Sequence, residues 1–160
     1  VTAVLSNKDP KNAERYAANN LAFQQELDLL QTRVVDAIAS LTPKKRILVT
    51  AHDAFNYFGK AYGFKVVGLQ GLSTATEAGV QDVQQLSEYI IQNNVKAIFI
   101  ESSVPRKTIE ALKAAVLSKG HQVSIGGSLY SDALGDTGSV EGTYTGMFLY
   151  NVKTIVNALQ

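Results

Sequence analysis

Three side chains that can hold a metal ion or move a proton stand at matching places in the sequence. His52, Glu101 and Asp132 each follow a short apolar run typical of a buried strand, directly or after a short loop. Gln70 follows a further apolar run of the same kind. In open parallel sheets, ligands bind where the carboxyl ends of the strands meet. We therefore expect these residues to gather at one edge of a sheet.

Each of these residues also has a purely structural interpretation. Glu101 can orient its neighbours by accepting hydrogen bonds from loop N–H groups, and Asp132 can serve only as a cap. We interpret Asp53 as the N-cap of the helix that follows His52 rather than as a ligand. His52 has no evident structural task, and imidazole is a common metal ligand. His52 is therefore the strongest functional candidate.

Other residues that could take part in chemistry are not proposed as members of the site. His121, the second histidine, is expected to start a strand and so to lie at the opposite edge of the sheet. Ser102-Ser103 could supply a nucleophile, but no second histidine is expected on that edge to activate it. The loop Gly126-Gly127-Ser128 matches neither a P-loop nor a GxGxxG fingerprint. Asp136 is interpreted as a turn residue.

Alternating strands and helices must position the candidates. Short continuous apolar strands separated by helices are typical of a parallel sheet that is covered on both faces. The predicted fold class is α/β, with a four-stranded parallel sheet flanked by helices and preceded by a long helix. Strands are predicted at 46–50, 64–69, 97–100 and 121–125. One helix is predicted to end at residue 62, and three more are predicted at 80–94, 108–119 and 141–159. A Ser/Thr-rich loop is predicted before residue 80.

The long helix is predicted from Asp9-Pro10 to about Leu41. Asp9 suits the N-cap, and Pro10 suits the first turn, where a missing N–H costs nothing. At about 1.5 Å per residue the helix would be about 45 Å long, more than the remaining residues can cover. We expect it to pack against, or bridge to, another part of a longer protein, which the abrupt start of the sequence also indicates. Its apolar stripe is Leu27, Leu30, Val34, Val35 and Ile38.

Composition narrows the functional classes. A chain of 160 residues suits one domain with its own core. Its 15 Lys+Arg are balanced by 14 Asp+Glu, so no basic surplus points to nucleic acid. No run approaches the ~18 apolar residues of a membrane span, and the first residues do not resemble a signal sequence. The absence of cysteine excludes thiolate metal sites and disulfides.

Four segments together resemble the TroA-like metal-binding proteins of bacterial ABC importers. These solute-binding components deliver zinc or manganese, and sometimes iron, to a membrane permease. The resemblance extends over nearly the whole chain with the segments in the right order, and their HDAF-x-YF, ESS-P and SDA-x-GD elements are specific to that family. They are LSNKDPKNAERYAANN, VTAHDAFNYFGKAYGFKVVGLQGLST, IFIESSVPRKTIEAL and GGSLYSDALGDTGSVEGTYTGMFLYNVKTI.

The resemblance implies two similar α/β lobes joined by one long helix, with a metal held between them by two side chains from each lobe. It assigns residues 1–42 to an N-terminal segment and the interdomain helix, and residues 43–160 to a Rossmann-like C-terminal lobe. The first lobe, with its two histidine ligands, would be absent. By the same resemblance His52 is the third metal ligand and Asp132 the fourth, and Glu101 supports them without touching the metal.

The implied function is the C-terminal half of an extracytoplasmic solute-binding protein, not an enzyme. It would capture Zn²⁺ or Mn²⁺ and deliver the ion to an ABC permease, in the periplasm or at the outer face of the cytoplasmic membrane, with or without a lipid anchor. Imidazole and carboxylate suit both ions. Histidine at position 52, where some relatives have glutamate, favours zinc. Metal binding by the half-site alone is expected to be weak or absent.

Two other functions stay open on the residues alone. One is a metal-dependent hydrolase, with His52 and Asp132 as ligands and Glu101 as general base, which would need a third ligand on the same edge. The other is a metal-free interaction module whose polar edge residues are only caps.

The absent first lobe also predicts an uncovered apolar surface. The long helix and the top of the domain should expose Tyr16, Phe23 or Leu27. We expect the isolated chain to self-associate through this surface, with exchange of the helix between copies as one route.

Overall fold

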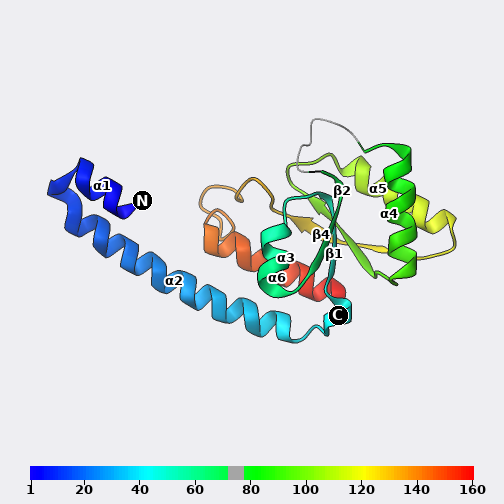
Figure 1. Cartoon of the computed structure of the whole chain (residues 1–160), viewed down its shortest axis with the longest axis horizontal. Helices are drawn as coiled ribbons and strands as arrows, with labels where there is room; N and C mark the ends of the chain where they lie inside the picture. Colours follow the sequence, from blue (N-terminus) through cyan, green and yellow to red (C-terminus); the bar gives the residue numbers. More distant parts are fainter. Residues whose placement is uncertain (72–77) are drawn as a thin grey trace.

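The fold was determined as a computed structural model, which describes residues 1–71 and 78–160 (Figure 1). The predicted Ser/Thr-rich loop falls on residues 72–77 and lies outside the described residues. An α/β body carries a long helix that extends well beyond it (Figure 1). The predicted class of fold, parallel strands flanked by helices after a long helix, is confirmed.

The N-terminal part contains two helices instead of the single one predicted. Helix α1 (Thr2–Lys8) precedes a short 3-10 turn (Pro10–Asn12) and helix α2 (Ala13–Ala39), and α1 folds back beside α2 (Figure 1). Asp9 stands between them, but its carboxylate accepts hydrogen bonds from side chains, Asn12 Nδ2 at 2.7 Å and the Tyr16 hydroxyl at 2.8 Å. These bonds lower the pKa of Asp9 below its ordinary value.

Only the C-terminal half of α2 packs against the body. Leu30, Val34 and Ile38 are buried there, and α2 lies against the last helix, α6 (Tyr144–Leu159). Val35 was predicted to share this stripe but is exposed, because successive residues of a helix point about 100° apart and Val34 takes the covered direction. The stripe is therefore narrower than the sequence predicted.

The body alternates strands and helices as predicted. The two parallel pairs are β1 with β2 and β3 with β4. The elements are a 3-10 turn (Pro43–Lys45), β1 (Ile47–His52), α3 (Asn56–Tyr62), β2 (Lys65–Gln70), α4 (Val80–Gln92), β3 (Ala97–Glu101), α5 (Arg106–Ser118), β4 (Ser124–Leu129) and α6.

The predicted four-stranded sheet is divided into two pairs of strands. Backbone ladders join β1 to β2 and β3 to β4, and β1 lies beside β3 with no ladder between them among the described residues. At the carboxyl ends of β1 and β3, the N–H of His52 donates to the side chain of Glu101. A side-chain contact thus joins the two strands at this edge.

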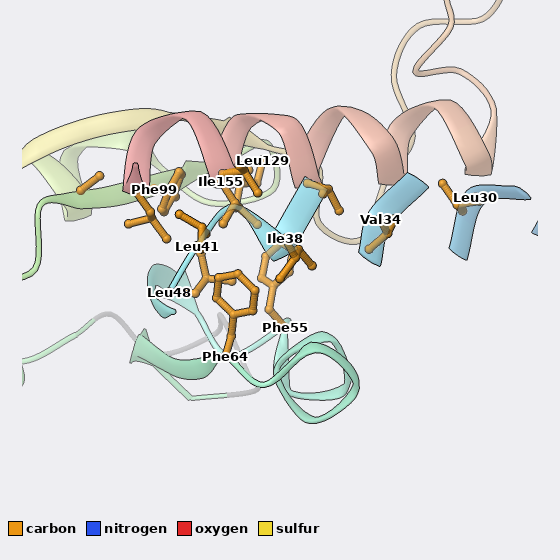
Figure 2. Close-up of a cluster of buried hydrophobic side chains, with 14 residues drawn as sticks. Leu30, Val34, Ile38, Leu41, Leu48, Phe55, Phe64, Phe99, Leu129 and Ile155 are labelled. Carbon is orange, nitrogen blue, oxygen red and sulfur yellow. The ribbon is translucent and has the colours of Figure 1, made fainter. Parts of the chain in front are cut away.

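Helices cover both faces of the strands. On one face Leu41, Leu48, Phe64 and Ile155 belong to a buried cluster in which α2 and α6 meet the strands (Figure 2). On the other face α4 and α5 bury a second cluster that includes Ile98. The burial of strands on both faces explains their continuous apolar sequences.

The fourth strand begins later than predicted. Strand β4 spans Ser124–Leu129 and includes Gly126 and Gly127, which the sequence placed in a loop. A Cβ at Gly126 would lie 2.6 Å from Ala158 Cβ and 2.7 Å from Phe99 Cε1, so only glycine lets β4 approach α6 and β3 this closely. Glycines that resemble a loop signal here mark a tightly packed strand. The pairing of β3 with β4 is also irregular there, since the register shifts between Ile98 and Phe99.

Alanine at position 126 is expected to destabilise the fold. The added methyl group would overpack the contact with Phe99 and Ala158 and should lower the free energy of unfolding by about 1–3 kcal/mol. Urea denaturation of Gly126→Ala measures the effect. Ser128→Ala, an exposed position of the same strand, is the control and should change the stability by less than about 0.5 kcal/mol. Equal stabilities of the two variants would contradict the packing argument.

Candidate metal-binding site

The carboxyl ends of the strands bring the candidate residues to one edge of the body. His52 is the last residue of β1 and pairs in register with Gln70, the last residue of β2. Glu101 is the last residue of β3, and Asp132 follows shortly after β4 ends at Leu129. Among these residues, short side-chain contacts join His52, Glu101 and Asp132.

Glu101 holds both the backbone and the ring of His52. Its Oε1 accepts the backbone N–H of His52 at 2.7 Å, and its Oε2 lies 2.7 Å from His52 Nδ1. Both residues are almost fully buried, with 3% and 2% of their surface exposed. A buried carboxylate is costly unless it is paired. Here Oε1 accepts a hydrogen bond from His52, and Oε2 lies at contact distance from the ring of the same residue without a hydrogen bond of good geometry. Of its two interpretations, the structure therefore gives Glu101 the orienting one.

The other nitrogen of the ring faces Asp132. His52 Nε2 lies 3.2 Å from Asp132 Oδ2, and the Asp132 side chain is 64% exposed. A carboxylate beside Nδ1 favours the tautomer with its proton on that nitrogen, which leaves a lone pair on Nε2. The imidazole thus connects a buried carboxylate to an exposed one and directs its lone pair toward the exposed edge.

The spacing between these two atoms suits a shared metal ion. Zn²⁺ binds nitrogen at about 2.0–2.1 Å and carboxylate oxygen at about 2.0–2.2 Å, so two ligand atoms of a tetrahedral site lie about 3.3–3.5 Å apart. The observed 3.2 Å between His52 Nε2 and Asp132 Oδ2 is close to this value. Residues 1–71 and 78–160 contain no group of three or more His, Cys, Asp or Glu side chains arranged to hold a metal. The described residues therefore offer a ligand pair and not a full set.

Asp132 has an unusual backbone conformation. Its φ is +58°, in the left-handed region that few residues other than glycine adopt, although aspartate tolerates it better than most. The next helix, α6, begins far downstream and has Thr143 as its N-cap. Asp132 therefore does not cap that helix, and its strained conformation directs the carboxylate toward His52. Strain of this kind is typical of binding sites.

Several supporting residues were missed by the sequence analysis. Thr50 Oγ1 donates to the carbonyl of His52 at 2.8 Å, and Ser103 Oγ lies 2.7 Å from Ser131 Oγ, joining the loops that follow β3 and β4. A Cβ at Gly68 would come within 2.9 Å of the His52 carbonyl carbon. Gly68 did carry a signal, because a glycine inside an apolar strand often marks a close backbone approach. The hydroxyl contacts carried no sequence signal, and the contact between Ser103 and Ser131 joins residues 28 positions apart in the chain.

The predicted N-cap role of Asp53 is wrong. Helix α3 begins at Asn56 with Phe55 at the N-cap position, and no side chain caps it. After β1 the chain first makes a bend in which the N–H of Ala54 donates to the carbonyl of His52. This bend delays the helix, so Asp53 lies before its start.

The residues that were set aside lie where they cannot extend the site. Ser103 is engaged with Ser131, and in the part of the chain that the structure describes no hydrogen bond joins a serine to a histidine. His121 lies between α5 and the amino end of β4, at the edge opposite His52, as predicted. The carbonyl of Asp136 accepts the N–H of Ser139 at 3.0 Å, which confirms the predicted turn.

A cavity of about 240 Å³ adjoins Asp132 between α3 and α6. Its walls are mainly apolar and aromatic, with Phe58, Tyr130 and Met147 among them, and Asp132 stands on its lining. Partial burial raises the pKa of Tyr130 above its ordinary value, with a further contribution from Glu141. The phenol therefore stays uncharged at neutral pH and adds no negative charge beside Asp132.

Parallel strands that present a histidine nitrogen and a carboxylate at their carboxyl edge define an α/β protein with a candidate metal-binding site. The sequence matches the family described as the periplasmic zinc-uptake complex component A, ZnuA, over residues 1–158. The chain therefore belongs to the ZnuA family. No helix among the described residues combines the length and apolar character needed to cross a membrane.

Named relatives of this chain bind zinc or manganese. The zinc-binding protein TroA of Treponema pallidum (strain Nichols) is 53% identical over 94% of this chain and 49% of its own length. The manganese-binding lipoprotein MntA of Bacillus subtilis (strain 168) is 47% identical over the whole chain and 52% of its own length. The manganese ABC transporter substrate-binding lipoprotein PsaA of Streptococcus mitis is 30% identical over 97% of this chain and 48% of its own length. The chain thus spans about half the length of these relatives.

A solved structure supports the same relationship. The periplasmic zinc-binding protein TroA from Treponema pallidum superposes with a TM-score of 0.96 at 51% sequence identity. The match covers 99% of this chain and 57% of that one. The fold described above, including the long α2, is therefore the fold of part of a TroA-like protein.

Removal of the Glu101 carboxylate is expected to destabilise the fold. Glu101→Ala leaves the N–H of His52 buried without its acceptor and removes the carboxylate beside ring Nδ1, which should lower the free energy of unfolding by about 3 kcal/mol. Urea denaturation measures the loss. Glu110→Ala, which removes only an exposed pair with Arg106, should cost less than about 1 kcal/mol. An unchanged midpoint for Glu101→Ala would show that the buried contact does not hold the strands together.

Proposed function

We propose that this chain supplies two ligands of a site with which an extracytoplasmic substrate-binding protein captures a divalent transition metal and delivers it to an ABC permease. The ligands are His52 Nε2 and Asp132 Oδ2. The observation that carries the proposal is their 3.2 Å separation at an exposed edge, with Glu101 fixing the ring from behind. Membership of the ZnuA family and the names of the relatives support it.

The ion is zinc or manganese. Imidazole nitrogen and carboxylate oxygen are ligands that both ions accept, and the chain has no cysteine to add a thiolate. The histidine nitrogen favours zinc, whereas the carboxylate suits manganese equally well. Asp132 lies at the surface, so the ion can enter and leave without unfolding of the chain. Such reversible access is what a carrier protein needs.

The proposal divides the chain at residue 42. Residues 43–160 form the lobe that carries both ligands, and residues 1–42 form the helical segment that connects it to a further lobe with the remaining ligands. The incomplete ligand set among the described residues supports this division. So does α2, whose N-terminal half extends beyond the body with α1 beside it (Figure 1).

The proposed carrier acts outside the cytoplasm and catalyses no reaction. Its family is described as periplasmic, and two of the named relatives are lipoproteins. We extend that location to this chain, in the periplasm or on the outer face of the cytoplasmic membrane. A lipid anchor would be an additional feature of the whole protein.

The alternative function as a metal-dependent hydrolase has less support. It requires Glu101 to activate a water as general base. Both oxygens of Glu101 instead contact His52, and the carboxylate is buried away from solvent. A hydrolase would also need a third ligand, and the described residues contain no suitable cluster.

Titration of the chain with Zn²⁺ and Mn²⁺ in a calorimeter tests the proposal. A two-ligand site should bind Zn²⁺ weakly, with a dissociation constant of about 1 μM or larger, equivalent to about −8 kcal/mol or less favourable. His52→Ala and Asp132→Ala should each abolish this binding. His121→Ala is the matched control, because this histidine lies at the opposite edge and its removal should leave binding unchanged.

The same titration can overturn the proposal. Equal binding by the wild type and by both ligand variants would remove His52 and Asp132 from the site. Nanomolar binding by a demonstrated monomer would show that one chain holds a complete site. Hydrolysis of a model ester or phosphate that is lost in His52→Ala would favour the enzyme instead.

We further propose that the chain on its own self-associates through its N-terminal helices. Val4, Leu21 and Phe23 are exposed on α1 and α2, with 64%, 58% and 45% of their surface accessible. The predicted exposure of Phe23 is confirmed, whereas Tyr16 and Leu27 are partly covered. Exposed apolar side chains along the same stretch of these helices favour association.

Light scattering over a range of protein concentrations measures this association. The wild type is expected to approach the mass of a dimer at high concentration, and Leu21→Ser combined with Phe23→Ser should shift it toward the monomer. Tyr57→Ser, an exposed aromatic position on α3, is the control and should leave the mass unchanged. A monomeric mass for the wild type at every concentration would contradict the proposal.

A further inference from the structure

The segment that carries Asp132 is held by a buried asparagine of α6. Asn151 is 6% exposed and lies inside this helix. Its Oδ1 accepts the backbone N–H of Tyr130 at 2.9 Å, and its Nδ2 donates to the carbonyl of the same residue at 2.9 Å. One side chain therefore satisfies both backbone groups of Tyr130, directly after β4 ends at Leu129.

These contacts lead from α6 to the ligand pair. Tyr130 is followed by Ser131, which is buried and has its Oγ 2.7 Å from Ser103 Oγ. Asp132 comes next, in its left-handed conformation, with its carboxylate 3.2 Å from His52 Nε2. The two residues before Asp132 are thus fixed from two sides while its own side chain stays exposed.

Only a side chain with both a donor and an acceptor can make this pair of bonds. A primary amide has both, in the same spacing that an extended backbone presents to a neighbouring strand. A leucine of similar size would leave the N–H and the carbonyl of Tyr130 without their partner, and an aspartate would place negative charge against the carbonyl. The geometry of the loop therefore depends on the amide of Asn151.

We infer that Asn151 is a positioning residue of the metal site, which sets the distance between Asp132 and His52 through the backbone of Tyr130. This inference rests on the proposed function. Asn151 touches neither ligand, so its effect passes through the loop. Groups that orient metal ligands typically change metal affinity by about 10–100-fold when they are removed.

The test compares Asn151→Leu with Val156→Ala in the whole chain. Val156 is buried in the same helix but contacts the core instead of the loop, so Val156→Ala lowers the stability without touching the site. Calorimetric titration with Zn²⁺ alone gives the affinity of each folded variant. Asn151→Leu is expected to bind Zn²⁺ about 10-fold more weakly than the wild type, and Val156→Ala to bind as the wild type does.

Hydrogen exchange of the free protein gives a readout that needs no metal. Asn151→Leu should speed exchange of the amides of residues 130–132 selectively, relative to those of β1, whereas Val156→Ala should produce no such local difference. The zinc-induced rise in melting temperature should likewise shrink in Asn151→Leu and persist in Val156→Ala.

The outcomes separate the two proposals. If the wild type binds Zn²⁺ through Asp132 and Asn151→Leu binds equally well, the positioning role fails and the proposed function stands. Equal losses of affinity in Asn151→Leu and Val156→Ala would assign the effect to stability alone and also overturn the positioning role. A wild type whose Zn²⁺ binding does not depend on Asp132 would overturn both.

Discussion

The contact between Glu101 and His52 is the interaction on which the site depends. No backbone ladder joins β1 to β3 among the described residues, yet these strands lie side by side in the centre of the body. The carboxylate of Glu101 receives the backbone N–H of His52 and approaches the ring at Nδ1. One buried anion therefore connects the two strand pairs and fixes the imidazole. Because burial makes an unpaired charge so costly, this geometry tolerates little variation.

The same contact leads to an asymmetric site. One nitrogen of the ring is committed to a buried carboxylate, and the other faces a carboxylate that is mostly exposed. The proposed ligand pair is buried on its inner side and exposed on its outer side. Burial keeps the ring oriented before an ion arrives, and exposure lets the ion exchange. Both properties support the proposed role in reversible metal capture.

Close packing on the far side of β4 bears on the position of Asp132, the second proposed ligand. Gly126 lets the strand lie against Phe99 and α6, and the loop that follows then meets Asn151 of that helix. The core and the site are therefore built from the same elements. The cluster that covers this face also holds the C-terminal half of α2 (Figure 2), so the long helix is anchored to the body there.

The sequence by itself determined the order of strands and helices and the edge at which His52, Glu101 and Asp132 meet. Both follow from local patterns, since apolar periodicity marks the elements and parallel strands end on the same side. Only the tertiary structure decided that Gly126 lies within a strand, that Asp53 precedes its helix, and that the strands form two separate pairs. It also decided which ring nitrogen faces which carboxylate. Apart from the short bend that places Asp53 before its helix, these features depend on contacts between residues far apart in the chain, and local patterns carry no information about such contacts.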